Sequence, residues 1–393
     1  MFLSTNLLST FIVNTIKTIK EFDVEPIWAA GLMSGTSLDG TIDVALIKTN
    51  GNFVEKFSTS KSFPYDKKLV KKIRECIIIA REWNFKGDEP EVFRTTEEMI
   101  TLAQAEAMTA FIKHADLDEP LGIIGFHGQT ILHKPPQGEE YGATRQLGNG
   151  PLMAEVLKVP VVYDFRTADM KAGGQGAPLC PSYHQALLKK QKNSKEIAIL
   201  NLGGIGNITW ADDEDLIAFD TGPANAPIND YVHSVNLGNM DKDGVLAARG
   251  ITDETILANI LCDPYFSKTY PKSLDRHDFL SDIVAGLSVE DAVATLTSLC
   301  GATVSKALNL LPEKPKEIIV CGGGRHNPTI MKEISERAQV KVSSAEDFGW
   351  RGDSIEAECF GFLAVRSLGD LPISFPKTTG VPIEMAGGTL CYP

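Results

Sequence analysis

Apolar and polar residues alternate from residue 27 onward at spacings that are typical of strands and of helices in turn. Two segments rich in Val, Ile, Ala and Leu, 27–34 and 41–49, flank SGTSLDG, whose Gly, Ser and Asp residues favour a tight connection. We therefore predict a β-hairpin here. The same patterns predict the other elements of the first half, which are strands at 53–58, 121–126 and 159–165 and helices at 67–82, 95–114 and 181–190.

The polar segment 191–196 ends this series, and a strand, a glycine turn and a second strand then begin the pattern again. We interpret this return as an internal repeat, and thus as two α/β halves. The predicted domains are an N-terminal extension at 1–26, a first lobe at 27–194 and a second lobe at 195–393, with the glycine loops facing a cleft between the lobes. The second half is predicted to hold strands at 196–210, 216–220 and 317–324 and helices at 289–311, 328–337 and 354–368.

The first 26 residues carry apolar side chains at near-helical spacing, but Lys17 and Lys20 follow the apolar part instead of preceding it. That order argues against a secretory signal peptide. We expect an amphipathic extension packed on the body of the protein, or a dispensable leader. No run of about 18 apolar residues occurs in the chain, so no transmembrane helix is predicted.

Composition narrows the possible classes of function. The chain of 393 residues is 43% hydrophobic and 23% charged, which is typical of a folded globular protein. Its formal net charge of −13 repels phosphate backbones and argues against nucleic-acid binding. The seven cysteines are odd in number, widely spread and never spaced as CxxC, so we expect reduced thiols in a cytoplasm instead of a disulfide framework or a zinc site.

Three loops rich in glycine follow predicted strands, at 31–40, 201–207 and 321–328. Glycine lets backbone N–H groups approach phosphate oxygens closely, and Ser and Thr hydroxyls add donors. One such loop is usually only a turn, but three at corresponding strand ends favour a phosphate-binding site. Asp39, in the first loop, offers a carboxylate for Mg²⁺, directly or through water. The chain lacks GxxxxGK[ST] and GxGxxG, which excludes a P-loop and disfavours a dinucleotide fold.

Phosphoryl transfer also needs a carboxylate that accepts a proton. Asp220 is the best candidate, because it ends the predicted strand 216–220 beside a turn, although such residues often serve only as caps. Asp164 and Arg166 alternate along a strand and therefore face one side, where they either bind a polar ligand or pair with each other. His127 either contacts substrate hydroxyls or is a structural donor.

The chain resembles the anhydro-N-acetylmuramic acid kinases from about Gly31 to its carboxyl end. The motifs that carry the resemblance are, in order, GLMSGTSLDG, FHGQT, DFR, AGGQGAP, NLGGIGN, FDTGPAN, DKDG, DPYF, PKS and CGGGRHNP. The resemblance implies a duplicated ribonuclease-H-like (actin-like ATPase) α/β fold with two lobes around a central cleft. It also implies a kinase that opens the 1,6-anhydro ring of anhydro-N-acetylmuramic acid with water and phosphorylates O6 with ATP and Mg²⁺, in peptidoglycan recycling in the bacterial cytoplasm.

The resemblance also assigns roles by position. The family's catalytic aspartate falls on Asp220, and its ATP-binding stretch runs from Gly35 to Asp43. Ala224 stands where the family commonly has glycine, a replacement that matters only if the backbone φ there is positive. The expected ATP- and phosphate-binding residues are Gly35, Thr36, Ser37, Leu38, Asp39, Gly40, Thr41, Ile42, Gly203, Gly204, Gly322, Gly323, Gly324 and Asn327. The expected substrate-binding residues are His127, Asp164, Arg166, Gly174, Gln175 and Asn225.

Two other functions stay open at this point. One is a kinase of another 1,6-anhydrosugar such as levoglucosan, because the sequence does not reveal a pocket for the lactyl group. The other is a non-catalytic ATP-gated binding protein of the Hsp70 kind, which would need a partner-binding module, whereas only about 25 residues follow the last predicted helix. The expected partners are therefore ATP and an anhydrosugar, with no nucleic acid and no membrane, and a homodimer is an assembly that the sequence leaves open.

Overall fold

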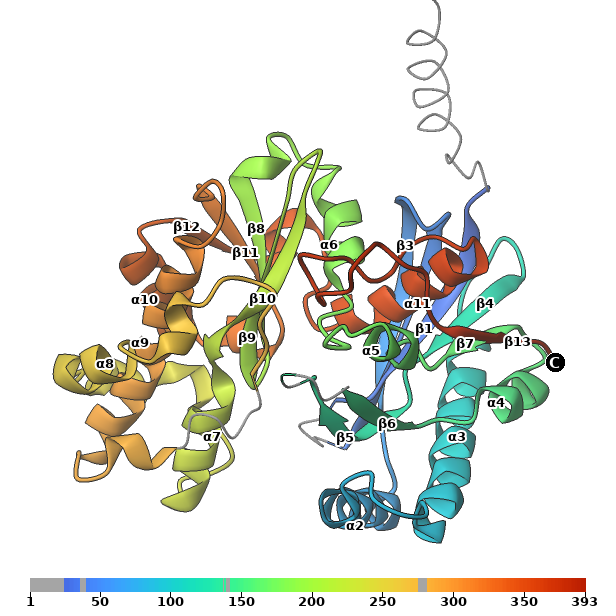
Figure 1. The fold of residues 1–393 in the computed structure, drawn as a ribbon, viewed down its shortest axis with the longest axis horizontal. Helices are drawn as coiled ribbons and strands as arrows, with labels where there is room; N and C mark the ends of the chain where they lie inside the picture. Colours follow the sequence, from blue (N-terminus) through green and yellow to red (C-terminus); the bar gives the residue numbers. More distant parts are fainter. Residues whose placement is uncertain (1–24, 36–39, 137, 139–141, 275–280) are drawn as a thin grey trace, which may run out of the picture.

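The computed structural model describes residues 25–35, 40–136, 138, 142–274 and 281–393. The predicted extension at 1–26 therefore lies almost wholly outside the described residues. The chain forms two lobes, each built on its own sheet (Figure 1). In the part of the chain that the structure describes, no helix combines the length and the hydropathy that a membrane span requires.

The first lobe is built on a six-stranded sheet in the order β13-β7-β4-β1-β2-β3. The strand β1 pairs antiparallel with β2, and β2 pairs antiparallel with β3. On its other side, β1 is parallel to β4 and β4 is parallel to β7, while β13 closes the sheet antiparallel to β7. The strands are β1 (Ile27–Met33), β2 (Thr41–Thr49), β3 (Val54–Pro64), β4 (Leu121–Phe126), β7 (Val161–Tyr163) and β13 (Thr389–Cys391).

The second sheet repeats this topology in the order β10-β9-β8-β11-β12. Here β8 is antiparallel to β9, β9 is antiparallel to β10, and β8, β11 and β12 are mutually parallel. The predicted internal repeat is therefore a repeat of structure, and the duplicated ribonuclease-H-like fold is confirmed. The strands are β8 (Ile197–Leu202), β9 (Ile205–Ala211), β10 (Leu216–Pro223), β11 (Glu317–Cys321) and β12 (Lys341–Ser344).

Helices cover both faces of the sheets. In the first lobe α2, α3 and α4 pack on one face, and in the second lobe α7, α9 and α10 pack on the outer face. The helices α6 and α11 contribute to a third core that includes side chains of both sheets and so joins the lobes. The α-helices are α2 (Lys67–Trp83), α3 (Glu91–Ile112), α4 (Gly150–Leu157), α5 (Thr167–Lys171), α6 (Pro181–Leu188), α7 (Asn225–Ser234), α8 (Glu254–Ile260), α9 (Val289–Leu308), α10 (Pro328–Ala338) and α11 (Ile355–Leu368).

The end of the chain returns to the first lobe instead of staying in the predicted lobe 195–393. The strand β13 joins the first sheet, and α11 packs directly on β1, β2 and β4. Two glycines permit this close approach, since a Cβ on Gly31 would lie 1.7 Å from the carbonyl oxygen of Ala357, and one on Gly125 would lie 1.9 Å from that of Phe360. Sequence patterns do not reveal this return, because it depends on contacts between distant segments.

Most predicted elements are present with shifted ends. The helix α3 begins at Glu91 instead of residue 95, and β3 extends to Pro64 instead of ending at 58. The strand β10 was expected to end at Asp220, but it continues to Pro223 with a register shift between Asp220 and Gly222. That expectation was wrong because pairing with β9 carries the strand through the glycine. The hairpin of β5 (Gln129–Lys134) and β6 (Ala143–Leu147) was not predicted.

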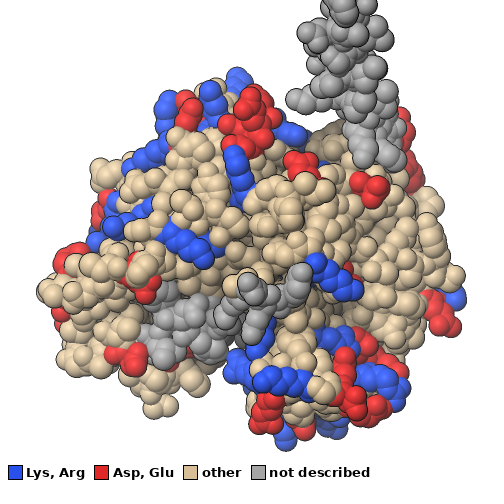
Figure 2. All heavy atoms as spheres, viewed as in Figure 1, with Lys and Arg blue, Asp and Glu red and all other residues tan. Residues whose placement is uncertain are grey.

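Charged side chains of both signs are mixed on the face that Figure 2 shows, including the region of α2 and α3 near its lower edge. Ion pairs also form within individual helices, such as Arg94 with Glu98 (3.8 Å) in α3 and Lys332 with Glu336 (3.8 Å) in α10. Exposed pairs of this kind contribute little to stability.

Candidate active site

Asp220 lies on β10, at the edge of the second sheet, opposite Asn207 of β9. Its backbone N–H donates to the carbonyl oxygen of Lys272 (3.1 Å), and its Oδ2 accepts from the backbone N–H of Leu274 (2.9 Å). The hydroxyl of Tyr265 donates to the carbonyl oxygen of Asp220 (2.7 Å). The segment 265–274 therefore covers the strand edge and leaves the carboxylate only half exposed to water.

This cover changes the acidity of the carboxyl group. Burial raises the pKa of Asp220 from 3.8 to about 7, against smaller lowering effects of the Leu274 N–H and the Lys272 ammonium group. The ammonium group of Lys272 lies over the rings of Phe219 (5.3 Å) and Tyr265 (4.4 Å), and burial lowers its pKa to about 8. A carboxyl group with a pKa near neutrality is suited to accept a proton and return it at physiological pH.

Two glycine turns of the second lobe lie against each other. The turn 203–204 connects β8 with β9, and the turn 322–324 follows β11, which is the parallel neighbour of β8. A Cβ on Gly324 would lie 2.6 Å from the Cβ of Leu202 and 3.1 Å from Nδ2 of Asn225, so contact between the turns requires glycine there. Most of the predicted phosphate-binding residues of the second lobe are thus brought together.

Three of these glycines are not explained by packing. A Cβ on Gly323 would meet no atom within 4 Å, and one on Gly203 or Gly204 would meet none closer than 3.6 Å or 3.4 Å. None of the three has a backbone φ in the left-handed region. Bare backbone that faces open space is what close approach of phosphate oxygens requires.

Asn225 lies with these turns and not with the other residues of the expected substrate wall. Its amide donates to the carbonyl oxygen of Leu202 (3.0 Å), and its backbone N–H donates to that of Gly203 (3.1 Å). Ala224, before it, has a φ of −125°, so the positive φ at which the loss of the family's common glycine would matter is absent there.

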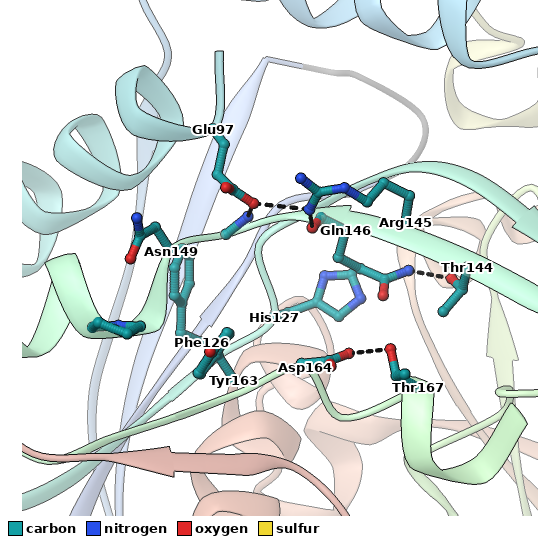
Figure 3. A pocket seen from close by; sticks show the side chains of 12 residues that line it. Glu97, Phe126, His127, Thr144, Arg145, Gln146, Asn149, Tyr163, Asp164 and Thr167 are labelled. Atoms are coloured by element: carbon teal, nitrogen blue, oxygen red, sulfur yellow. Dashed lines mark hydrogen bonds and ion pairs between the residues drawn. The ribbon is translucent and has the colours of Figure 1, made fainter. Parts of the chain in front are cut away.

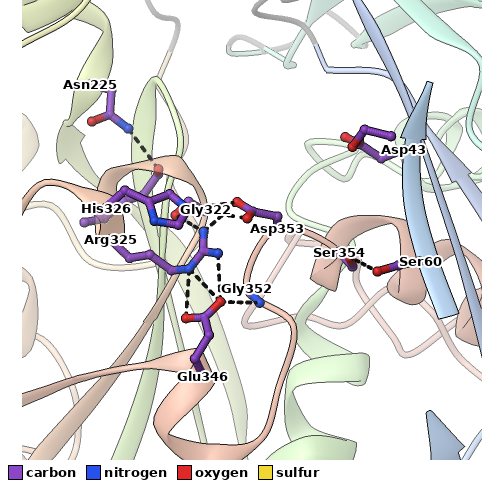
Figure 4. A network of polar contacts seen from close by, with 12 residues as sticks. Asp43, Ser60, Asn225, Gly322, Arg325, His326, Glu346, Gly352, Asp353 and Ser354 are labelled. Carbon is purple, nitrogen blue, oxygen red and sulfur yellow. Dashed lines mark hydrogen bonds and ion pairs between the residues drawn. The ribbon is translucent and has the colours of Figure 1, made fainter. Parts of the chain in front are cut away.

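The third glycine loop is held by a buried guanidinium group (Figure 4). Arg325, whose side chain is 3% exposed, donates to Glu346 (2.8 Å), to Asp353 (2.6 Å) and to the carbonyl oxygen of Gly322 (2.9 Å). Asn327 caps α10, because its Oδ1 accepts from two N–H groups of the first turn (3.0 and 3.1 Å). The structure thus gives Asn327 a structural task besides the phosphate contact expected of it.

The first glycine loop is anchored at both ends. The hydroxyl of Ser34 donates to the carbonyl oxygen of Gly128 (3.1 Å), and the backbone N–H of Tyr65 donates to that of Gly40 (2.7 Å). Gly40 has a φ of +84°, which favours glycine, and Gly35 is half-buried. The expected phosphate ligands Thr36, Ser37, Leu38 and Asp39, and with Asp39 the expected Mg²⁺ ligand, lie outside the described residues.

The residues after this loop begin β2 and face in different directions. The side chain of Ile42 is buried in the core of the first lobe, so only its backbone is left for a nucleotide. Thr41, at the start of the strand, is half-buried. Asp43 accepts a hydrogen bond from Ser62 and lines a cavity of about 360 Å³ that also includes Asp353 of the second lobe (Figure 4). The nucleotide stretch of the first lobe therefore leads to the junction of the two lobes.

Two of the expected substrate residues, His127 and Asp164, line one cavity of about 380 Å³ (Figure 3). The cavity lies beside the carboxyl ends of β4 and β7 and the hairpin β5–β6. Its other polar side chains include Gln146 and Asn149. Asp164 has a φ of +51°, and its Oδ1 accepts from the Thr167 hydroxyl (2.6 Å). A carboxylate held in a sparsely populated backbone conformation is common at functional sites.

Arg166 adjoins this cavity through His127. The guanidinium donates to Nε2 of His127 from Nε (3.3 Å) and Nη2 (3.1 Å), while Nδ1 of His127 lies 2.9 Å from the carbonyl oxygen of Gly128. The imidazole is therefore neutral with its proton on Nδ1, because only that tautomer satisfies both partners. Burial and the Arg166 charge lower the pKa of His127 to about 3. A neutral imidazole that accepts from Arg166 has no acidic proton on Nε2 to give to a ligand.

The GGQGAP segment, residues 173–178, forms a loop, which we call the sugar loop because it was expected in the substrate wall. Arg166 donates to the carbonyl oxygen of Gly176 (2.6 Å), and the backbone N–H of Gly176 donates to Asp169 Oδ1 (2.6 Å). A Cβ on Gly174 would lie 2.2 Å from this same oxygen. The backbone of Gln175 forms hydrogen bonds with Thr379, near the end of the chain, and with His133 in β5. The structure thus places Arg166 in contact with the loop that contains Gly174 and Gln175, next to the cavity.

Two residues of this region, Lys272 and Glu356, were not predicted from the sequence. Lys272 belongs to the motif PKS, which contributes to the family resemblance but was assigned no role. The carbonyl oxygen of Lys272 accepts a hydrogen bond from the backbone N–H of Asp220. Glu356 is exposed on the first turn of α11, and its Oε1 accepts from the amide of Asn201 at the end of β8 (3.3 Å). An acidic residue in a first helical turn is common for electrostatic reasons alone, so its sequence position gave no functional signal.

Comparison with known proteins agrees with the resemblance that the motifs carry. The family model for anhydro-N-acetylmuramic acid kinase matches residues 28–393. Proteins named anhydro-N-acetylmuramic acid kinase from Mesorhizobium japonicum and Rhizobium rhizogenes are 53% and 54% identical over 369 residues, which cover 93% of this chain and 100% of each relative. A solved structure of gluconate kinase from Lactobacillus acidophilus is 10% identical, with a TM-score of 0.42 and 94% of both chains covered. The chain belongs to the anhydro-N-acetylmuramic acid kinase family.

Proposed function

We propose that this chain opens the 1,6-anhydro ring of anhydro-N-acetylmuramic acid with water and transfers the γ-phosphate of ATP to O6. The products are N-acetylmuramic acid 6-phosphate and ADP. The observation that carries the proposal is the half-buried carboxyl group of Asp220 with its pKa raised to about 7, at the position of the family's catalytic aspartate. The proposed location is the cytoplasm, which the seven unpaired cysteines support.

In this proposal the carboxylate of Asp220 is the one proton acceptor that the two chemical events require. Its carboxylate accepts a proton from a water molecule as the water oxygen bonds to C1 of the sugar and the C1–O6 bond breaks. The freed O6 attacks the γ-phosphorus, whose bond to the β,γ-bridging oxygen breaks and releases ADP. Asp220 then gives its proton to solvent. One carboxylate suffices, because the leaving oxygen of the first event is the phosphoryl acceptor of the second.

The glycine turns 203–204 and 322–324 are proposed to bind the ATP phosphates through backbone N–H groups, with the first glycine loop on the opposite lobe. The open space at Gly203, Gly204 and Gly323 fits such a ligand. Among the described residues, no group of three or more His, Cys, Asp or Glu side chains is arranged to hold a metal ion. We therefore assign Mg²⁺ to the ATP phosphates and water, with Asp39 as its candidate protein ligand. When bound, Mg²⁺ neutralises phosphate charge.

The cavity beside His127 is proposed to hold the sugar. Asp164 offers acceptors for sugar hydroxyls, and Gln146 and Asn149 offer amide groups. Arg166, fixed by His127 and Gly176, adds a positive charge at the wall. Levoglucosan lacks the lactyl and N-acetyl groups and would fill less of this volume, so we expect it to be a poorer substrate.

The test is to incubate the protein with Mg-ATP and anhydro-N-acetylmuramic acid in ¹⁸O-labelled water. We expect a 6-phosphorylated sugar that carries the label at C1, with one ADP formed per sugar. Levoglucosan serves as the matched substrate, and Asp220→Asn serves as the matched protein. Unreacted anhydro-N-acetylmuramic acid would refute the substrate, and a phosphorylated product without label at C1 would refute the attack of water.

A further inference from the structure

A short segment near the end of the chain contacts both the strand that carries Asp220 and the sugar loop of the first lobe. This segment, residues 377–381, is called the strap here; it lies between α11 and β13 and belongs to neither. Thr378, Thr379 and Val381 are buried within it, although they carry no reactive group. Three backbone N–H groups, those of residues 378–380, lie 3.2 to 3.3 Å from the carbonyl oxygen of Phe375, so the segment is compact.

The strap first contacts the strand that carries Asp220. The backbone N–H of Ala218 donates to the carbonyl oxygen of Lys377 (3.1 Å), and Nζ of Lys377 lies 2.6 Å from Oδ1 of Asp215. The next outward N–H along this edge belongs to Asp220 and donates to Lys272. The strap and the PKS segment therefore cover the edge of β10 one after the other.

The strap also packs on the PKS segment itself. Gly380 has a φ of +89°, and a Cβ there would lie 2.8 Å from Cγ of Pro271. Pro271 directly precedes Lys272, and Leu274 follows with the N–H that donates to the Asp220 carboxylate. Any outward shift of the strap or of Pro271 is therefore transmitted to the groups that surround this carboxylate.

At its other end, the strap contacts the sugar loop of the first lobe. The backbone N–H of Gln175 donates to the carbonyl oxygen of Thr379 (2.7 Å), and a Cβ on Gly174 would lie 2.8 Å from Cγ1 of Val381. The carbonyl oxygen of Gln175 in turn lies 2.9 Å from Nε2 of His133 in β5. The same five residues thus touch the catalytic strand of one lobe and the sugar loop of the other.

We infer that the strap is a positioning element, which fixes the sugar loop of the first lobe relative to Asp220 on the second. The inference rests on the proposed function for its catalytic consequence. Attack of water on C1 and of O6 on phosphorus both require alignment to within about 1 Å, and misplacement of this size costs roughly a hundredfold in rate. A buried segment bonded to both lobes is a direct means of holding that alignment.

The experiment compares Gly380→Ala with Gly286→Ala. Both glycines have nearly the same left-handed φ, +89° and +90°, so an added methyl group strains the backbone equally. Only at Gly380 does it press on Pro271, because a Cβ on Gly286 meets no atom within 4 Å. We expect kcat to fall at least tenfold in Gly380→Ala with KM for ATP within twofold of the parent, and both constants to stay at parental values in Gly286→Ala.

A second readout does not depend on activity. The carboxyl ¹³C resonance of Asp220, assigned by its loss in Asp220→Asn, reports the titration of this group directly. Because burial is the largest cause of its raised pKa, displacement of the covering segment should admit water and move the titration to lower pH in Gly380→Ala only. A merely structural role would lower thermal stability without moving this titration in the folded protein.

Identical titration curves and kcat values in the folded parent, Gly380→Ala and Gly286→Ala would overturn the inference. Should Gly380→Ala not fold, Val381→Ala loosens the contact with Gly174 without backbone strain, and Val54→Ala removes the same atoms from a buried site on β3. We then expect KM for the sugar to rise at least fivefold in the first variant only, and equal values would refute the inference. A parent that is inactive on the sugar but shows the Gly380→Ala titration shift would refute the proposed function alone.

Discussion

The strands β3 and β10 occupy the same position in the two repeats, yet they differ in what surrounds them. Each is the third antiparallel strand and the edge of its sheet. Along β3 most side chains are exposed or half-exposed, whereas along β10 all are buried except Asp220. The edge of β10 is covered by the segment 265–274 and the strap. The repeated fold thus places Asp220 on an edge strand, and the covering segments reduce its contact with water. That burial raises the pKa of the carboxyl group, so that it can act as a base near neutral pH.

The largest expected effect tests this comparison directly. Replacing Asp220 by Asn keeps the shape and removes the proton acceptor, so we expect kcat to fall by about 10²–10⁴-fold. Binding of ATP, measured calorimetrically, should be unchanged. The control is Glu55→Gln on β3, an exposed carboxylate in a weak ion pair with Lys48 (3.8 Å), which should retain parental kcat. Parental turnover in Asp220→Asn would remove this residue from the mechanism.

The next effect distinguishes a glycine that serves a ligand from one that serves the backbone. Gly323→Ala adds a methyl group into open space, so we expect unchanged stability but KM for ATP raised roughly tenfold, about 1.4 kcal/mol. Gly87→Ala, at φ +73° in the first lobe, should instead cost about 1 kcal/mol of stability and leave KM unchanged. Urea unfolding and steady-state kinetics measure both; parental KM in Gly323→Ala would argue against phosphate binding at this turn.

A smaller effect compares helix caps in the two lobes. Asn327→Ala on α10 and Asp66→Ala on α2 each remove a side-chain acceptor from a first helical turn, so each should lower the free energy of unfolding by about 1 kcal/mol. If Asn327 also contacts phosphate, Asn327→Ala raises KM for ATP and Asp66→Ala does not. Asn327→Asp, which keeps the cap, should then raise KM for ATP as well. Equal KM values in all three variants would leave Asn327 as a cap alone.

The smallest expected effect concerns the pH profile. Asp220 is active when ionised, so kcat/KM falls as pH drops through its pKa of about 7. The Lys272 charge lowers that pKa, and Lys272→Met removes the charge while keeping apolar contact with Phe219 and Tyr265. The acid limb should therefore move to higher pH by roughly half a unit. An unmoved limb, with a folded variant, would show that the charge of Lys272 does not reach Asp220.

Several candidate site residues could be proposed from the sequence because their signal is local. Gly203, Gly204 and Gly323 stand in strand–turn patterns that identify close backbone approach, and Asp220 and His127 follow apolar runs. The grouping of these residues was less predictable. Asn225 was expected beside the sugar, but it packs on the turn 203–204, because α7 begins directly above that turn.

The sequence by itself determined the repeated α/β pattern, the glycine turns, the family and the residue types available for catalysis, since each depends on neighbours along the chain. Tertiary structure alone decided that the carboxyl end crosses back to the first sheet, that the strap joins both lobes, and that Asp220 is half-buried. Those properties arise from contacts between segments 45 or more residues apart in the sequence, and the environment of a charge, not its position in the chain, sets its pKa.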